Sequence, residues 1–543
     1  LELIARRLQE VRARHGAQAI LRLGGSGSCR GALHNTASLT QRFLALLGGF
    51  TEISGNYSSA AEGFVTPYLF GEPNGGLDPA TLRHSRLILL WGANPCDTRF
   101  GGLLVPALRA ARRRGVPVIV IDPRRSRTAV ELRSEWLPVY PGADAALMAA
   151  VLYVLLEEGR VDRAFVETRS VGFAALERYV RGEDDGLPKD PAWAEGVCGT
   201  PQAAIRDLAR LYAASRPAAL IPGLSIQRTV GGEEAIRMAV ALQVATGNLG
   251  IPGGASGASV WNRLPGPRCG SLPVPRHTGP QVPVYRWADA VLGGKAGGHP
   301  SDIRLIYNVG GNYLATGSDI GKSVRAFRKV DFAVGHDYVL TPTARFCDVV
   351  LPVTTFLERE DIVFPAANYL FHSAAAIAPV GQARDDYDVF CDLADRLGFG
   401  AAFSEGRSSA DWLRLFLEQS EVPDPERFRA TGIHAGAEQE RVAFSAFAAD
   451  PRGPPLATPS GELELACPAY AGLGVPAHPT WRGFSPRRDF PLLLVTPHAR
   501  YRINSQFANE PWFAAREPQV LWVHPTDAAA RGLAEARDAE IRS

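Results

Sequence analysis

Glycine, asparagine and aspartate residues follow several apolar segments of this 543-residue chain. The loop W-G-A-N-P at 91–95 ends the apolar run 86–91, and D-P-R at 122–124 follows the run 116–121. Ligands of an α/β sheet bind at the carboxyl ends of its strands, so these loops are candidate binding loops. Asp122 could accept hydrogen bonds from a ribose or from the edge of a guanine. For D-P-R alone, an Asp-Pro turn without a ligand is the simpler interpretation.

A second candidate is the turn G-N-Y-S-S at 55–59, which carries two neighbouring hydroxyl groups, those of Ser58 and Ser59. Taken alone, a serine in such a turn is most often a turn or helix-capping hydroxyl. A deprotonated serine is also a hard oxygen donor that suits a high-valent metal. The turn alone leaves both roles open for either serine.

These loops need a sheet to position them, and the apolar runs predict one. The runs 86–91 and 116–121 are apolar apart from Arg86 at the start of the first, and they flank a segment with helical spacing at 103–114. Fully apolar strands joined by a helix are typical of a parallel sheet that is covered on both faces. Further helices are predicted at 145–156, 233–245 and 389–397, and further strands at 218–221, 303–309, 331–334 and 348–352.

The length of the chain exceeds what one hydrophobic core supports, so we predict a multidomain α/β protein. A discontinuous α/β domain is expected at 1–80 and 300–404, and a Rossmann-like domain at 81–299, with a long loop at 251–300. A connector with little core of its own is expected at 405–489. The segment 490–543 should begin a last domain, with strands at 491–495 and 520–523 and a helix at 527–531. No internal repeat is visible.

Charge and cysteine usage exclude several classes. The formal net charge of +2 argues against a nucleic-acid-binding protein. The seven cysteines form no Cys-x-x-Cys, which excludes a local iron-sulfur or zinc knuckle. The longest apolar run, 145–156, is too short to span a bilayer, so no direct membrane insertion is expected. No Gly-x-Gly-x-x-Gly follows the first strand of a βαβ unit, so a nicotinamide dehydrogenase lacks support.

Further motifs occur in a fixed order along the chain: P-G-A-D at 141–144, G-L-S-I-Q-R at 223–228, T-G-N-L-G at 246–250 and N-V-G-G-N at 308–312. Later landmarks are G-H-D-Y at 335–338, T-P-S-G-E-L-E-L from 458 and T-P-H-A-R-Y from 496. With the turn at 55–59, this series resembles the molybdopterin oxidoreductases of the dimethyl sulfoxide reductase superfamily over nearly the whole chain. Within it, the chain is most similar to the catalytic subunits of anaerobic dimethyl sulfoxide reductases.

The resemblance implies roles for individual residues. Ser58 would be the catalytic residue and the protein ligand of the metal, with Ser59 as the alternative one position later. One guanine dinucleotide would be contacted by Gly92, Asn94, Thr98, Asp122, Arg124, Gly142, Asp144, Gly223 and Gln227. The second dinucleotide or the pterins would be contacted by Gly311, Asn312, His336, Asp337, Thr496, His498 and Ser505. The expected fold has parallel-sheet dinucleotide-binding domains, one in each of the first two predicted domains, and a truncated, β-rich C-terminal domain that also binds the cofactor.

The resemblance also implies a cofactor and an activity. The cofactor would be bis-molybdopterin guanine dinucleotide with molybdenum or tungsten, and the reaction the reduction of an S-oxide or N-oxide by oxygen-atom transfer in anaerobic respiration. We expect the chain to be part of a longer protein whose amino-terminal region carries an iron-sulfur cluster. The expected partners are an iron-sulfur electron-transfer subunit and a membrane anchor subunit, at the periplasmic side of a membrane. The alternatives are another substrate (selenate, nitrate or a hydratase reaction) or a non-catalytic structural relative.

Overall fold

The computed structural model describes residues 1–25, 31–72, 75–98, 102–258, 266–364, 368–436, 440–450, 452–483, 489–533 and 538–541. The chain divides into two compact units, both discontinuous in sequence. Unit 1 comprises residues 1–60 and 262–441, and unit 2 comprises residues 61–261 and 442–543. These boundaries differ from the predicted ones at 80 and 300. The strand β8 (Gln281–Pro283) pairs with β2 (Glu52–Ser54) in unit 1, and side chains of α3 (Ala60–Phe70) join the core of unit 2.

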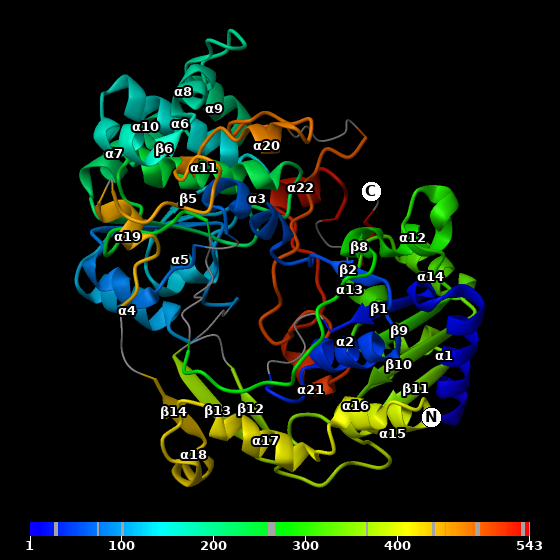
Figure 1. Ribbon diagram of the computed structural model, residues 1–543. Helices are drawn as coiled ribbons and strands as arrows, with labels where there is room; N and C mark the ends of the chain where they lie inside the picture. Colours follow the sequence, from blue (N-terminus) through cyan, green and yellow to red (C-terminus); the bar gives the residue numbers. More distant parts are fainter. Residues whose placement is uncertain are drawn as a thin grey trace. The chain divides into compact units, whose positions relative to one another are not determined.

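Unit 1 is built on a four-stranded parallel sheet in the order β1 (Ile20–Gly24), β9 (Leu305–Val309), β10 (Phe332–Asp337) and β11 (Val349–Pro352) (Figure 1). Alternate residues of each strand face opposite sides. Leu305 and Tyr307 pack with α1 (Glu2–His15), α2 (Thr36–Leu47) and α15 (Asp386–Arg396). Ile306 packs on the other face with α12 (Trp287–Gly293) and α14 (Ile320–Lys329). Both faces of the sheet are therefore buried.

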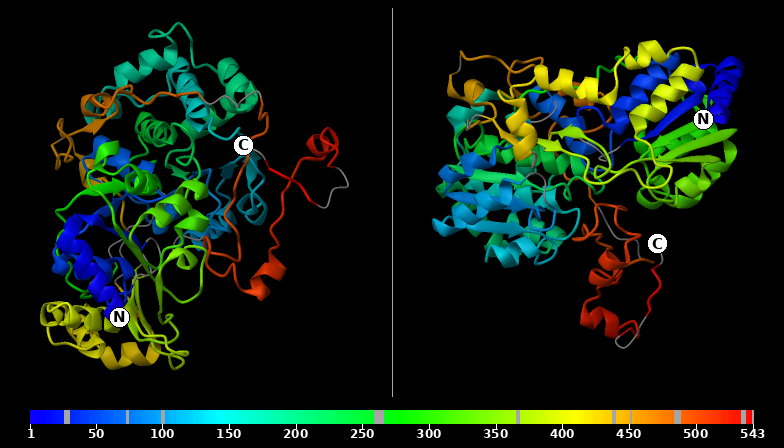
Figure 2. Two further views of the ribbon diagram at one scale, coloured as in Figure 1. Left: turned by 90° about the vertical axis from the view of Figure 1, so that its right-hand side faces the viewer. Right: turned by 90° about the horizontal axis from the view of Figure 1, so that it is seen from below.

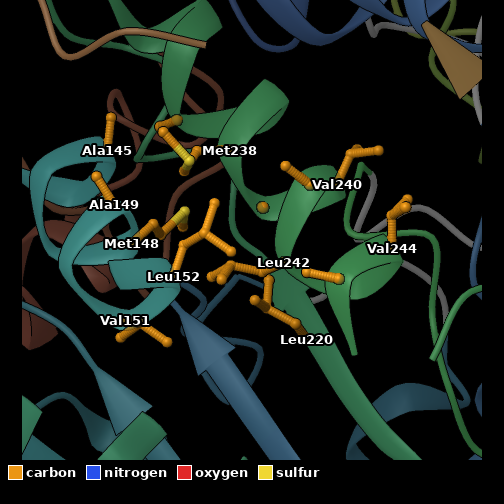
Figure 3. Close-up of a cluster of buried hydrophobic side chains, with 14 of the residues drawn as sticks. Ala145, Met148, Ala149, Val151, Leu152, Leu220, Met238, Val240, Leu242 and Val244 are labelled. Carbon is orange, nitrogen blue, oxygen red and sulfur yellow. The ribbon is translucent and has the colours of Figure 1, made fainter. Parts of the chain in front are cut away.

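Unit 2 contains a second four-stranded parallel sheet in the order β5 (Glu135–Leu137), β4 (Val118–Ile121), β3 (Leu87–Trp91) and β7 (Ala218–Pro222). On one face Leu89 and Leu220 pack with α6 (Asp144–Glu157) and α11 (Gly232–Ala245). Figure 3 shows the side chains of α6 and α11 meeting those of β7 in this core. On the other face Leu90 packs with α4 (Leu104–Arg113). The predicted α/β class with buried parallel strands is confirmed.

The remaining elements are shorter or peripheral. The other strands are β6 (Ser170–Val171), β12 (Asp361–Val363), β13 (Tyr369–Ser373), β14 (Ile433–Ala435) and β15 (Leu463–Glu464). The other α-helices are α5 (Arg127–Glu131), α7 (Arg163–Arg169), α8 (Phe173–Arg181), α9 (Pro191–Cys198), α10 (Gln202–Ala214), α13 (Tyr313–Thr316), α16 (Gly400–Ser404), α17 (Ser409–Glu418), α18 (Pro425–Thr431), α19 (Ser445–Ala449), α20 (Pro468–Ala471), α21 (Pro511–Arg516) and α22 (Pro525–Ala529). None of the helices in the described part of the chain is long and apolar enough to cross a membrane.

Two predicted loops contain more structure than the sequence indicated. The expected loop at 251–300 includes β8 and α12, whose Trp287 is buried in the core of unit 1. The expected connector at 405–489 is divided between the two units. Its α17 buries Trp412 in unit 1, and its later part buries Phe447 and Tyr470 in unit 2. The connector thus contributes a few widely spaced aromatic side chains to the cores of the two units. Their wide spacing gives no periodic apolar pattern, so the sequence did not reveal these contributions.

The segment after residue 490 does not form the predicted strands. Residues 491–495 and 520–523 are irregular, with Leu494 61% exposed and Trp522 88% exposed. Figure 2 shows this segment in orange and red, with short helices and long irregular stretches. A strand needs a partner for its backbone hydrogen bonds, and neither apolar stretch has one among the described residues. The helix predicted at 527–531 corresponds to α22.

A buried ion pair fastens the segment 476–480 to α11 in unit 2. The guanidinium of Arg237 contacts the Glu234 carboxylate at 2.8 Å, and both side chains are at most 2% exposed. Arg237 also donates to the carbonyl oxygens of residues 476, 477 and 478. Glu234 accepts from the Tyr470 hydroxyl at 3.2 Å and from the Thr480 amide at 3.1 Å. Every partner lies in one unit, so the pair ties sequence-distant parts of that unit together.

Removing one charge of this pair should strongly destabilise unit 2. We expect Arg237→Met to lower the free energy of unfolding by about 3–5 kcal/mol, because a buried carboxylate then lacks its cation. Urea denaturation followed by circular dichroism measures the change. The control is Arg163→Met at the exposed pair Arg163–Glu177, which should cost less than about 1 kcal/mol. Equal effects of the two variants would contradict the anchoring role of Arg237.

Candidate functional site

The nine residues expected to contact the first dinucleotide gather at the carboxyl edge of the unit 2 sheet. Each strand contributes a short loop or the start of a helix at this edge. In the order of strands β3, β4, β5 and β7, the residues are Gly92, Asn94 and Thr98; Asp122 and Arg124; Gly142 and Asp144; and Gly223 and Gln227. The strand ends predicted from the sequence therefore meet at one edge of one sheet.

Glycines allow two of these loops to touch. The amide of Gly92 donates to the carbonyl oxygen of Ile121 at 2.7 Å, and Gly92 has a φ of +61°, which disfavours other residues. A Cβ atom on Gly223 would lie 1.9 Å from the carbonyl oxygen of Gly92. The Ser225 hydroxyl donates to that same oxygen at 2.6 Å. Close backbone contact between the β3 and β7 loops thus requires both glycines.

Two buried carboxylates lie at this edge. Asp122 accepts the Arg124 amide at 2.9 Å, and burial raises the pKa of its carboxyl group. Asp144 stands in the first turn of α6 and accepts the indole N–H of Trp91 at 3.0 Å. Burial raises the pKa of Asp144 to about 7, and the charge of Asp122 adds to the rise, although the Trp91 bond opposes it. A ligand that donates N–H or O–H groups would stabilise both carboxylates.

Gln227 and Arg124 have different surroundings from the other residues at this edge. The side-chain oxygen of Gln227 accepts the amide of Glu62 at 2.9 Å, so Gln227 caps the first turn of α3. Sequence reasoning missed this tether, because the two residues lie far apart along the chain. The side chain of Arg124 is exposed at the rim of the edge.

Asn94 links the loop after β3 to the segment after β4. Its side-chain oxygen accepts both the hydroxyl of Thr128 at 2.7 Å and the amide of Thr128 at 3.2 Å. Its side-chain nitrogen donates to Asp97 at 2.9 Å. The Thr128 hydroxyl in turn accepts the amide of Cys96 at 3.1 Å. Thr128 is fully buried and was not among the predicted site residues.

The carboxyl edge of the unit 1 sheet brings together Gly311, Asn312 and Asp337. Gly311 and Asn312 follow β9, and Asp337 ends β10. Asp337 accepts the Tyr338 amide at 2.9 Å and the Thr341 hydroxyl at 3.0 Å, and burial raises the pKa of its carboxyl group. These three residues therefore occupy the strand-end positions that the sequence analysis expected.

The two edges are built alike. In each, a glycine with a φ of +61° directly follows a strand and donates its amide to the neighbouring strand: Gly92 in unit 2 and Gly310 in unit 1. An asparagine follows two positions later, and an aspartate stands at the end of the next strand. Asn312 accepts the Thr343 hydroxyl at 3.0 Å and its amide at 3.3 Å, as Asn94 does with Thr128. The sequence showed no repeat, because the likeness lies in a few spaced residues and in backbone geometry.

His336 does not contact the candidate site, contrary to the expectation for it. Its side chain is 0% exposed and points into the core beneath α15. One ring nitrogen lies 2.9 Å from Asp386 and the other 3.0 Å from the Tyr307 hydroxyl. Successive residues of a strand face opposite sides of the sheet, so Asp337 and its neighbour cannot share one face. His336 ties β10 to β9 and to the amino end of α15.

The turn that carries Ser58 precedes α3. The side-chain oxygen of Asn56 accepts the amides of Ser58 at 2.8 Å and Ser59 at 2.7 Å, which fixes the turn. The Ser59 hydroxyl lies 3.5 Å from the same oxygen. Tyr57 donates its hydroxyl to the carbonyl oxygen of Val284 at 3.1 Å and so ties the turn to unit 1. Both serines are half-buried, and the geometry of the turn does not separate them.

The three C-terminal candidates are not gathered at a sheet edge. Thr496 and His498 are exposed, and Ser505 is half-buried, on the irregular segment after residue 490. The Nδ1 atom of His498 lies 2.6 Å from the carbonyl oxygen of Ala499, the next residue. Their expected role in cofactor binding stays a prediction.

Two buried polar atoms at the edges fit a ligand. The Ser126 hydroxyl, four positions after Asp122, is buried and has no hydrogen-bond partner among the described residues. In unit 1, the side-chain oxygen of Asn308, three positions before Gly311, is also buried and has no hydrogen-bond partner among the described residues. A buried polar atom without a partner is costly, and a bound polar group would relieve that cost. With the buried carboxylates, these atoms suit a ligand rich in N–H and O–H groups.

The buried carboxyl group of Asp144 predicts a pH dependence of stability. Its pKa is raised on folding, so its contribution to the free energy of unfolding is present below about pH 4 and is lost as the pH rises to about 7. Asp144→Asn cannot ionise, so the variant should gain stability relative to the wild type as the pH rises through this window. Urea denaturation between about pH 4 and pH 8 measures the difference. The exposed Asp207→Asn is the control, and a pH-independent difference for Asp144→Asn would contradict the prediction.

Comparison with known proteins identifies the family. Residues 1–396 match the family model described as molybdopterin oxidoreductase, and residues 492–543 match the molydopterin dinucleotide binding domain. In fold, the chain is similar to acetylene hydratase from Pelobacter acetylenicus, with a TM-score of 0.74 and 21% identity over 98% of this chain and 76% of that one.

Curated relatives match over almost the whole chain. Trimethylamine-N-oxide reductase of Haemophilus influenzae is 31% identical over 100% of this chain and 73% of its own length. Dimethyl sulfoxide/trimethylamine N-oxide reductase of Cereibacter sphaeroides is 33% identical over 98% and 72%. Dimethyl sulfoxide reductase DmsA of Escherichia coli is 31% identical over 98% and 73%. Because the family model also covers most of the chain, this protein is an oxidoreductase that belongs to the molybdopterin oxidoreductase family.

Proposed function

We propose that this protein reduces an S-oxide or an N-oxide, such as dimethyl sulfoxide, by oxygen-atom transfer in anaerobic respiration. The main support is that the carboxyl edges of the two parallel sheets have the same arrangement of glycine, asparagine and threonine. The similar relatives are named dimethyl sulfoxide and trimethylamine N-oxide reductases. The serine in the turn at 55–59 adds support, because a hard oxygen ligand suits a high-valent metal.

Two molybdopterin guanine dinucleotides would be held, one at each edge. Asp122 and Asp144 at one edge and Asp337 at the other offer buried carboxylates that can accept N–H groups of guanine or O–H groups of ribose. The cofactor, with molybdenum or tungsten, would supply the two-electron chemistry of oxygen-atom transfer. Because the carboxyl edges of the two sheets are built alike, we expect each edge to bind a similar dinucleotide, rather than one edge to bind a ligand and the other to stay empty.

The protein's own residues would orient the cofactor and supply one ligand to the metal. Asn56 fixes the backbone of the turn, so the Ser58 hydroxyl is presented from a rigid position just before α3. The glycines Gly92 and Gly223 let backbone groups come close to a bound ligand. Trp91 keeps the carboxylate of Asp144 in one orientation through its indole N–H.

The wider assembly completes the proposal. Electrons would arrive from an iron-sulfur cluster in an amino-terminal region of the longer protein and from an iron-sulfur partner subunit. A membrane anchor subunit would hold the enzyme at the periplasmic side of a membrane.

Cofactor and substrate assays test the function. Full-length protein from a host that makes the dinucleotide cofactor should contain about one metal and two GMP equivalents per chain. It should oxidise a reduced viologen dye when dimethyl sulfoxide or trimethylamine N-oxide is added. Metal analysis and GMP release by acid measure the cofactor, with selenate and nitrate as comparison substrates. Loaded protein that reduces selenate or nitrate but neither oxide would contradict the proposed substrate class.

The ligand assignment predicts a specific loss in one variant. Ser58→Ala should retain the dinucleotides, whose contacts lie at the sheet edges, but should lose oxide reduction by orders of magnitude. The electron paramagnetic resonance signal of the metal should also change. Ser58→Cys should keep a ligand and shift the signal differently, because a thiolate is a softer donor than an alkoxide. Ser59→Ala is the matched control. If only the Ser59 variant shows these effects, the ligand is Ser59.

A further inference from the structure

We propose that Thr128 and Thr343 are positioning residues, each of which sets the shape of one dinucleotide-binding edge. Neither threonine was expected to act at the site. Each uses its hydroxyl group to join two strand-end loops of one sheet, which we call a threonine latch. The inference rests on the proposed function, because it concerns how the two edges hold the two dinucleotides.

The first latch is in unit 2. Thr128 is fully buried in the first turn of α5. Its hydroxyl donates to the side-chain oxygen of Asn94 at 2.7 Å and accepts the amide of Cys96 at 3.1 Å. Its own amide also donates to Asn94, at 3.2 Å. Three hydrogen bonds therefore join the loop after β3 to the segment after β4, which carries Asp122 and the unpartnered Ser126 hydroxyl.

The second latch repeats this pattern in unit 1. Thr343 is fully buried, and its hydroxyl donates to the side-chain oxygen of Asn312 at 3.0 Å. The same hydroxyl accepts the amide of Leu314 at 2.9 Å. The Thr343 amide donates to Asn312 at 3.3 Å. In both units the hydroxyl thus accepts the amide two residues after the asparagine.

The pattern explains why threonine occupies both positions. The hydroxyl must donate to one group and accept from another at the same time, which valine cannot do and serine can. Burial excludes water that could replace the lost bonds. The latches fix the orientation of the side-chain amides of Asn94 and Asn312. Because both asparagines are candidate cofactor contacts, this orientation determines which of their amide atoms a ligand can reach. Substitution by valine keeps the volume and the β-branch and removes only the hydrogen bonds.

Matched variants of the full-length holoenzyme test the latches. GMP that remains bound is measured over time after dilution, with the melting temperature as the control for folding. We expect Thr128→Val and Thr343→Val each to release about half of the GMP about tenfold faster than wild type, because each loosens one edge. The double variant should release both halves faster. Thr128→Ser and Thr343→Ser should restore slow release.

The controls are two buried threonines outside the edges, Thr66 on α3 and Thr40 on α2. Each donates its hydroxyl to a carbonyl oxygen of its own helix. Thr66→Val and Thr40→Val should leave GMP release unchanged. Unchanged release in the folded Thr128→Val and Thr343→Val proteins, or a lower melting temperature alone, overturns the inference. Wild-type protein that contains no GMP overturns the proposed function, and this inference with it.

Discussion

The requirement that a parallel strand be covered on both faces governs this structure. Each central strand sends alternate side chains into two different cores, so helices must pack on both sides of each sheet. Only the strand ends remain for polar chemistry. Parallel strands place all of their carboxyl ends at one edge, and the two sheets therefore each offer one edge for ligand contacts.

The parts of the fold that depend on this requirement could be predicted from sequence. The strands β3 and β4 are continuously apolar, and the polar residues after them, Asn94 and Asp122 among them, lie at the expected edge. The features that the sequence did not reveal depend on contacts between distant residues. Gln227 caps a helix that lies far away in the sequence, and the buried charges of Glu234 and Arg237 gain meaning only from their partners in 470–480.

His336 shows a different kind of failure. His336 and Asp337 belong to one sequence motif and were expected to share one role. Neighbouring side chains of a strand point to opposite faces of the sheet, so only one of the two can face a given side. The likeness of the two edges was also hidden. It depends on glycine backbone conformation at 92 and 310 and on hydrogen bonds to two threonines, none of which produces a recognisable sequence period.

The discontinuity of both units has a consequence for biosynthesis. The strand β1 pairs with β9, with Ile20 opposite Leu305, so the ribosome must make all of the first segment of unit 2 before the partner of β1 emerges. Until then the apolar strand β1 and the helix α2 have only local contacts. Such a nascent chain is prone to aggregate, and loading of a large cofactor before release would be premature. Shielding of residues 1–60 until β9 has been made would prevent this exposure.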